Sequence, residues 1–171
     1  MDLTQQILAA FDGVKKDITQ TLHQAQYTGD YGMSSDFSNA DYNAAKKKDK
    51  HQIWQQIPYK NVLACDAALT FATDQNYAYF MAANLFYAAL ALENENLNDD
   101  LIGRVIFQLT YQPKKETGLN ERFDLFSVAQ QQSILQFLQN CQQLAITKMN
   151  NGGLYEPLYN VAEIPILLDN H

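Results

Sequence analysis

The 171-residue sequence predicts an all-α fold, an irregular single-domain bundle of five to seven helices. Two observations predict it. Apolar residues recur at steps of three and four along several segments, and residues that start or stop helices flank those segments. No segment outside the C-terminal tail alternates in the way of a β-strand, and no internal repeat is present. A chain of this length can bury roughly two thirds of its unfolded surface, which favours one domain over residues 1–171.

The N-terminal part predicts one helix followed by a long loop. Residues 3–22 carry a helical apolar pattern that Asp2 or Thr4 can open, and Gly13 weakens that helix by about 1 kcal/mol relative to alanine. The periodicity then disappears, and glycine, serine and aspartate turn formers follow. We therefore expect a loop at about 26–45, and loops of this length often carry function.

The middle of the chain predicts three helical segments. Residues 44–54 can form a short helix with four lysines on its first turns, which Pro58 closes. Residues 60–73 have a crowded helical pattern. Residues 73–92 are apolar on nearly every face, which predicts the central buried helix.

Two further helices are predicted in the C-terminal part. Asn98 or Asp99 can cap a helix that runs to Leu109. Ser127 and Gln130 match a capping box, and the helix behind them ends at the asparagines and glycines of residues 150–153. The apolar tail after them is expected to pack back on the bundle.

Several aromatic and small-residue motifs recur at defined places. They are Trp54 with Ile57-Pro58, then Ala68-Leu69-Thr70-Phe71-Ala72-Thr73, and Tyr77-Ala78-Tyr79-Phe80-Met81-Ala82-Ala83. With these motifs the chain resembles an uncharacterised bacterial domain family of small helical proteins. The resemblance covers most of the chain except the expected loop. Ala82 stands where the family usually has a proline, so a proline kink is absent. The resemblance implies a helical fold and no activity.

Composition and charge exclude several classes of ligand. The formal net charge is -7 with a pI near 4.8, which repels nucleic acid and anionic membranes and attracts a basic protein. The first residues lack the pattern of a signal peptide, and the apolar stretch at residues 81–92 is too short to span a bilayer. We therefore expect a cytoplasmic location.

The sequence contains no complete catalytic, cofactor or metal-binding motif. His23, His51 and His171 are scattered without ligand spacing, and no phosphate-binding glycine loop occurs. Cys65 and Cys141 stand alone and are expected to be buried, reduced thiols, although the sequence leaves open whether they meet. The expectation is a protein without a cofactor and without enzymatic activity.

Two features are candidates for partner binding. The segment 93–100 holds four carboxylates, on Glu93, Glu95, Asp99 and Asp100, which form either a docking face for a basic partner or a solvated connection between helices. The expected loop holds Tyr27, Tyr31 and Tyr42, and exposed tyrosines are good interface anchors, although they can also simply cover the bundle.

These observations favour a non-enzymatic protein-binding module with one basic protein partner. An immunity protein that neutralises a basic bacterial toxin is one example. Two alternatives stay open, namely a small-molecule binder or enzyme with a pocket among the helices, and a structural or oligomeric domain. A deep cleft with converging polar groups and a perturbed carboxylate would favour the pocket.

Overall fold

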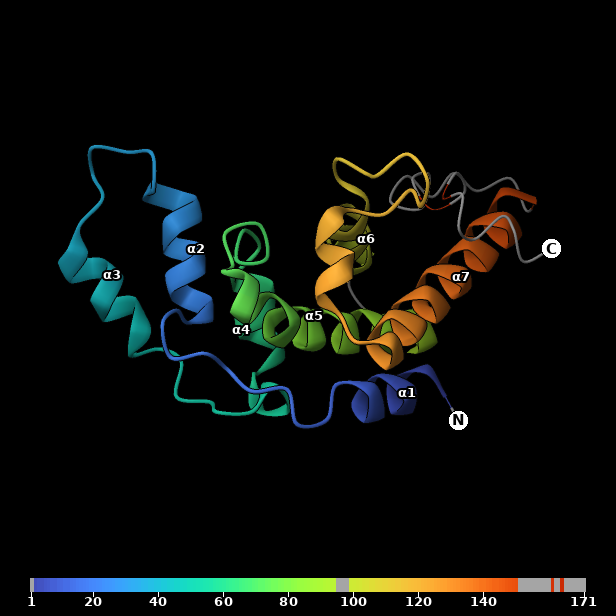
Figure 1. Ribbon diagram of the computed structural model, residues 1–171, viewed down its shortest axis with the longest axis horizontal. Coiled ribbons are helices and arrows are strands. Elements are labelled where there is room, and N and C mark those ends of the chain that lie inside the picture. The colour runs from blue at the N-terminus through green and yellow to red at the C-terminus, as the bar shows by residue number, and fades with distance from the viewer. Residues whose placement is uncertain (1, 95–98, 151–160, 162–163, 165–171) are drawn as a thin grey trace. The chain divides into compact units, whose positions relative to one another are not determined.

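The computed structural model describes residues 2–94, 99–150, 161 and 164, and it confirms the all-α prediction (Figure 1). Its elements are α1 (Leu3–Ala10), α2 (Leu22–Tyr31), α3 (Asn39–Lys46), α4 (Tyr59–Ala64), α5 (Asp74–Asn94), α6 (Asp99–Thr110) and α7 (Val128–Asn150), with 3₁₀ turns at Trp54–Gln56 and Glu121–Leu125. The described residues contain no strand, only an isolated bridge between Lys15 and Ile53. None of the helices in the described part is long and apolar enough to cross a membrane.

The chain divides into two compact units. Unit 1 comprises Met1–Phe11 and Leu85–His171, and unit 2 comprises Asp12–Asn84. The boundary falls within α5, which is continuous through Ala82. A single domain over residues 1–171 stays a prediction.

Unit 1 is organised around the contact of α1 with α7. Three large side chains of this unit are completely buried: Ile7 of α1, Phe11 just after it, and Phe137 of α7. The ring of Phe11 also meets Phe126 edge to face, with 6.0 Å between the ring centroids. The predicted capping box opens α7, because Ser127 N donates to Gln130 Oε1 and Gln130 N donates to Ser127 Oγ.

The N-terminal helix is much shorter than the predicted residues 3–22. Asp2 caps it, as expected, by accepting a hydrogen bond from Gln5 N at 2.7 Å. The helix ends at Ala10, and Gly13 then adopts a φ of +73°, a conformation that glycine takes at little cost. Ile18, which the helical pattern placed on a buried face, is an exposed residue of the irregular segment that follows.

The prediction of a long loop at about 26–45 is wrong. The helices α2 and α3 occupy most of this range, and residues 32–38 connect them. A capping box of Thr21 with Gln24 opens α2, and Ser38 caps α3 through Asp41 N. The helix expected at residues 44–54 accordingly lies earlier. Gly29 on α2 is required by close packing, since a Cβ there would lie 2.6 Å from Ala67 Cβ.

The central buried helix is confirmed as α5, whose residues 77–91 are largely inaccessible. The helical pattern at residues 60–73 is realised only in α4, and turns follow it at residues 66–71. Cys65 and Cys141 are both buried and unbridged, as expected. The predicted helix stop at residues 151–153 and the packing of the tail lie outside the described residues, apart from the buried Val161 and Ile164.

Candidate functional site

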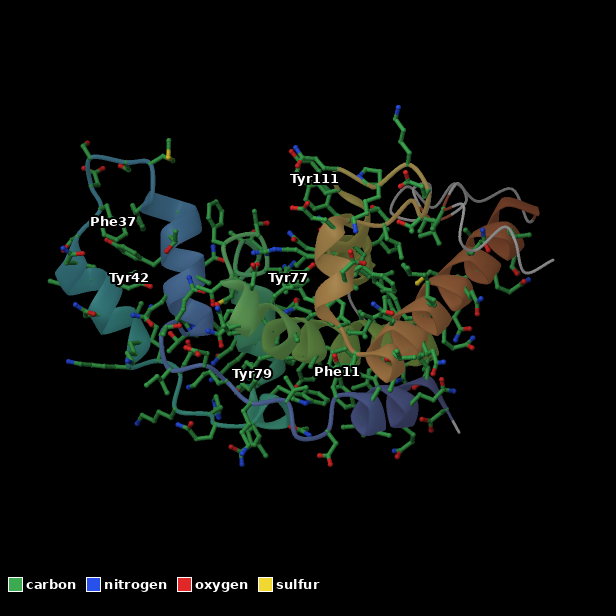
Figure 2. The ribbon with its side chains drawn as sticks, viewed as in Figure 1. Phe11, Phe37, Tyr42, Tyr77, Tyr79 and Tyr111 are labelled. Atoms are coloured by element: carbon green, nitrogen blue, oxygen red, sulfur yellow. The ribbon has the colours of Figure 1, made fainter. Side chains whose placement is uncertain are left out.

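Four aromatic rings gather between α2 and α3 in unit 2. The ring centroid of Tyr27 lies 4.8 Å from that of Tyr31, 5.4 Å from that of Phe37 and 6.2 Å from that of Tyr42. Phe37 and Tyr42 lie 5.9 Å apart, and Figure 2 shows them close together beside α3. The Tyr27 hydroxyl also accepts a hydrogen bond from Ser38 N at 3.0 Å. The aromatic group thereby fixes the end of α2 against the start of α3.

The outer end of this pair of helices presents apolar side chains to solvent. We call residues 30–38 the α2–α3 tip. Within it Met33 is fully exposed, Tyr31 is 41% exposed and Phe37 is 38% exposed. From residue 30 to residue 41 every charged side chain is a carboxylate. The tip therefore combines aromatic and methionine side chains with negative charge.

A cavity of about 500 Å³ lies between α2 and α3. Its lining includes His23, Tyr27, Asp30, Asp41, Ala44 and Lys48. Its volume is within the range of small-molecule sites in proteins. Among the described residues, no group of three or more His, Cys, Asp or Glu side chains is arranged to hold a metal ion.

One wall of the cavity is fixed by a hydrogen-bonded pair, His23 with Asp49, that the sequence did not indicate. Asp49 accepts two hydrogen bonds from His23, one from the backbone N–H and one from Nδ1, each at 2.8 Å. The carboxylate is only 6% exposed and the imidazole 15%. Because Asp49 also sits at the first turn of α2, its charge faces the positive end of that helix.

The burial of Asp49 has electrostatic consequences. Burial by itself raises the pKa of the Asp49 carboxyl, but hydrogen bonds and charge from His23 outweigh it and hold that pKa below its ordinary value. Tyr79 lies near this carboxylate, and its hydroxyl donates to the His51 carbonyl at 3.5 Å. Burial, and then the Asp49 charge, raise the pKa of Tyr79 well above its usual range. The carboxylate is therefore charged and the phenol neutral at pH 7.

A family model matches residues 1–154 and carries the description "Family of unknown function (DUF6714)". The chain belongs to the DUF6714 family. The match includes residues 26–45, which the resemblance seen in the sequence had left out. Neither the search of curated proteins nor the search of solved structures gives a match.

In this DUF6714 protein the structure describes the side chains of only two of the four acidic candidates of segment 93–100, namely Glu93 and Asp100. Glu93 is used inside unit 1, where its Oε1 accepts hydrogen bonds from Leu3 N at 3.0 Å and Thr4 N at 3.3 Å. Asp100 is exposed on the first turn of α6. Glu95 and the side chain of Asp99 lie outside the described residues. As a docking face, the segment stays a prediction.

The role of Glu93 predicts a change in stability. Glu93→Gln should lower the free energy of unfolding by about 1 kcal/mol, because an amide oxygen replaces a carboxylate at the N-terminus of α1. Urea denaturation measures this, with Glu116→Gln as the matched control at another exposed position. The control should stay within about 0.5 kcal/mol of the wild type. Equal effects of the two changes on the free energy of unfolding would show that Glu93 does not stabilise the N-terminus of α1.

The tyrosine candidates are brought together, and the structure adds residues that the sequence analysis missed. Tyr27 and Tyr42 are half-buried, whereas Tyr31 is exposed. Met33 and Phe37 complete the exposed surface of this family member, and they carried no motif. The signal that was available is the Thr21-x-x-Gln24 capping box, which would have placed Tyr27 and Tyr31 one turn apart on a helix.

Proposed function

We propose that this protein is a non-enzymatic protein-binding module and that the α2–α3 tip is its interface. The observation that carries the proposal is the exposure of Met33, Tyr31 and Phe37 on a tip where three aromatic rings pack around Tyr27. Tyrosine and other aromatic side chains dominate the energetics of protein interfaces, and methionine adapts to irregular partner surfaces. A rigid aromatic group also loses little conformational entropy on binding.

The charge around the tip supports a basic partner. Asp30, Asp36 and Asp41 surround the exposed apolar residues, and the whole chain carries a net charge of -7. Opposite charges at the rim of an interface speed association and favour the correct partner, and salt weakens both effects. The narrower proposal, a cytoplasmic immunity protein that neutralises a basic bacterial toxin, rests on this charge.

The tip proposal predicts the effect of one substitution. Met33→Lys should weaken capture of the partner from an extract of the source cells at least about tenfold, since it removes an apolar anchor and repels a basic surface. The thermal midpoint should not change, because Met33 has no buried surface to lose. Quantitative capture on the tagged full-length chain, at low and moderate salt, measures this.

Two control variants make the capture experiment decisive. Ile18→Lys makes the same charge change at another exposed apolar residue of unit 2 and should leave capture unchanged. Tyr111→Lys tests another exposed aromatic surface, the pair of Phe107 and Tyr111, whose ring centroids lie 4.8 Å apart in unit 1. Loss of capture in Tyr111→Lys but not in Met33→Lys would move the interface away from the tip and contradict the proposal.

A further inference from the structure

The cavity between α2 and α3 is hollow because small residues face it. Ala44 and Ala45 of α3 and Ala64 of α4 contribute to its lining, and each leaves room that a larger side chain would fill. Ala44 is exposed, whereas Ala45 is buried, so the two residues lie at different depths. The volume of about 500 Å³ is ample for one long side chain or a small ligand.

Aromatic rings form part of the wall. Tyr27 and Tyr31 both line the cavity, and their rings lie 4.8 Å apart with 36° between their planes. The faces of aromatic rings carry negative potential and attract organic cations that lie against them. The hydroxyl of Tyr27 already accepts a hydrogen bond from Ser38, which fixes the position of that ring.

Two carboxylates of the lining are anionic hydrogen-bond acceptors. Asp30 and Asp41 are carboxylates on opposite helices. The Nδ1 atom of His23 is engaged with Asp49 at 2.8 Å, so Nε2 is the ring nitrogen that stays on the side of the lining. Gln26 is engaged elsewhere, since it donates to Asp30 and Asp66 and accepts from Ala67 N. Lys48 is the one cationic residue of the described lining.

We propose that this cavity binds the guanidinium group of an arginine side chain supplied by the protein partner. A guanidinium group is planar, stacks on tyrosine rings and offers five N–H donors, so it suits a site of aromatic walls and several acceptors. The inference rests on the proposed function, because the tip at the end of the same two helices brings the partner to the cavity mouth. Lys48 opposes the ligand and limits its affinity.

The test titrates the full-length protein with N-acetyl-arginine amide and follows the backbone amide signals by NMR. Saturable shifts are expected at residues 26–31 and 41–48. N-acetyl-citrulline amide has the same shape without the charge and should cause none. Asp30→Asn should weaken binding about two- to fivefold, and Lys48→Gln should strengthen it by a similar factor. Ala44→Leu fills the cavity from an exposed position and should abolish the shifts while the rest of the spectrum stays unchanged.

Several results would overturn the inference. Equal shifts with the citrulline analogue would show that charge is not recognised, and unchanged binding in Ala44→Leu would place the cation elsewhere. If Ala44→Leu abolishes the shifts but leaves partner capture intact, the cavity takes a free cation and not the partner's arginine. If the titration fails while Met33→Lys still loses the partner, the cavity inference falls and the proposed function stands.

Discussion

Asp49→Asn is expected to lower the free energy of unfolding by about 2 to 3 kcal/mol. The carboxylate is nearly inaccessible and accepts two hydrogen bonds of 2.8 Å from His23. Hydrogen bonds to a charged group contribute about 1.5 to 3 kcal/mol. Asparagine has only one side-chain oxygen, so when that oxygen accepts from one of the two His23 donors, its NH₂ group faces the other donor. Urea denaturation at pH 7 measures the loss.

Asp36→Asn is the matched control, because it makes the same change at an exposed aspartate of the tip. Its effect should stay within about 0.5 kcal/mol. If the two variants are equally stable, the His23–Asp49 pair contributes nothing to the fold of unit 2, and the fixed wall of the cavity is not maintained by it.

The same pair predicts a dependence on pH. Because the pKa of Asp49 is lower in the folded protein than its ordinary value of 3.8, the unfolded chain takes up a proton first as the pH falls. The stabilisation by Asp49 is therefore complete above the unfolded pKa and is lost as the pH falls through the folded pKa. The difference in unfolding free energy between wild type and Asp49→Asn should shrink below about pH 4. A difference that grows there would contradict this sign.

Asn76→Ala is expected to lower the free energy of unfolding by about 3 kcal/mol. Asn76 is completely buried on α5, where its Oδ1 accepts from Asp17 N at 2.9 Å and its Nδ2 donates to the Gln20 carbonyl at 3.2 Å. The change leaves at least two backbone groups of the irregular segment before α2 without their partner, and each such group costs about 1 to 3 kcal/mol when it stays buried.

Asn94→Ala on the same helix is the control for Asn76→Ala. Asn94 is exposed, and its amide donates within the helix to the Leu90 carbonyl, so alanine should be neutral or slightly stabilising. Hydrogen exchange adds a local readout, since the Asp17 amide should lose protection in Asn76→Ala. Unchanged protection there would show that Asn76 does not hold the segment.

The all-α class and the central helix were predictable because they depend on local patterns. The alanine-rich apolar run of residues 77–91 and the Ser127-x-x-Gln130 box are read within one or two helical turns. The same kind of box at Thr21-x-x-Gln24 was hidden, because the apolar residues from Leu3 to Leu22 continue a helical spacing through Gly13. The positive φ of Gly13, and not the periodicity, decides where that helix ends.

The site was predicted only in part, because its contacts join residues that are far apart in the sequence. Tyr27, Tyr31 and Tyr42 were recognised by residue type, but their packing depends on a turn whose geometry no local pattern shows. His23 and Asp49 are far apart in sequence, and the packing of α2 against α3 accompanies their contact in the folded chain. Glu93 is an exposed residue, and its two backbone partners likewise come from α1, far away in the sequence. Tertiary pairing of this kind leaves no spacing to find.

The most direct test of the central claim is site-specific photo-crosslinking in the cells that make the protein. Benzoylphenylalanine is placed at position 33 of the full-length chain and, as the control, at position 128, where Val128 is 70% exposed in unit 1. The account predicts one crosslinked partner, a basic protein, from position 33 and none from position 128. The same partner from position 128, or none from position 33, would contradict the assignment of the α2–α3 tip as the binding surface.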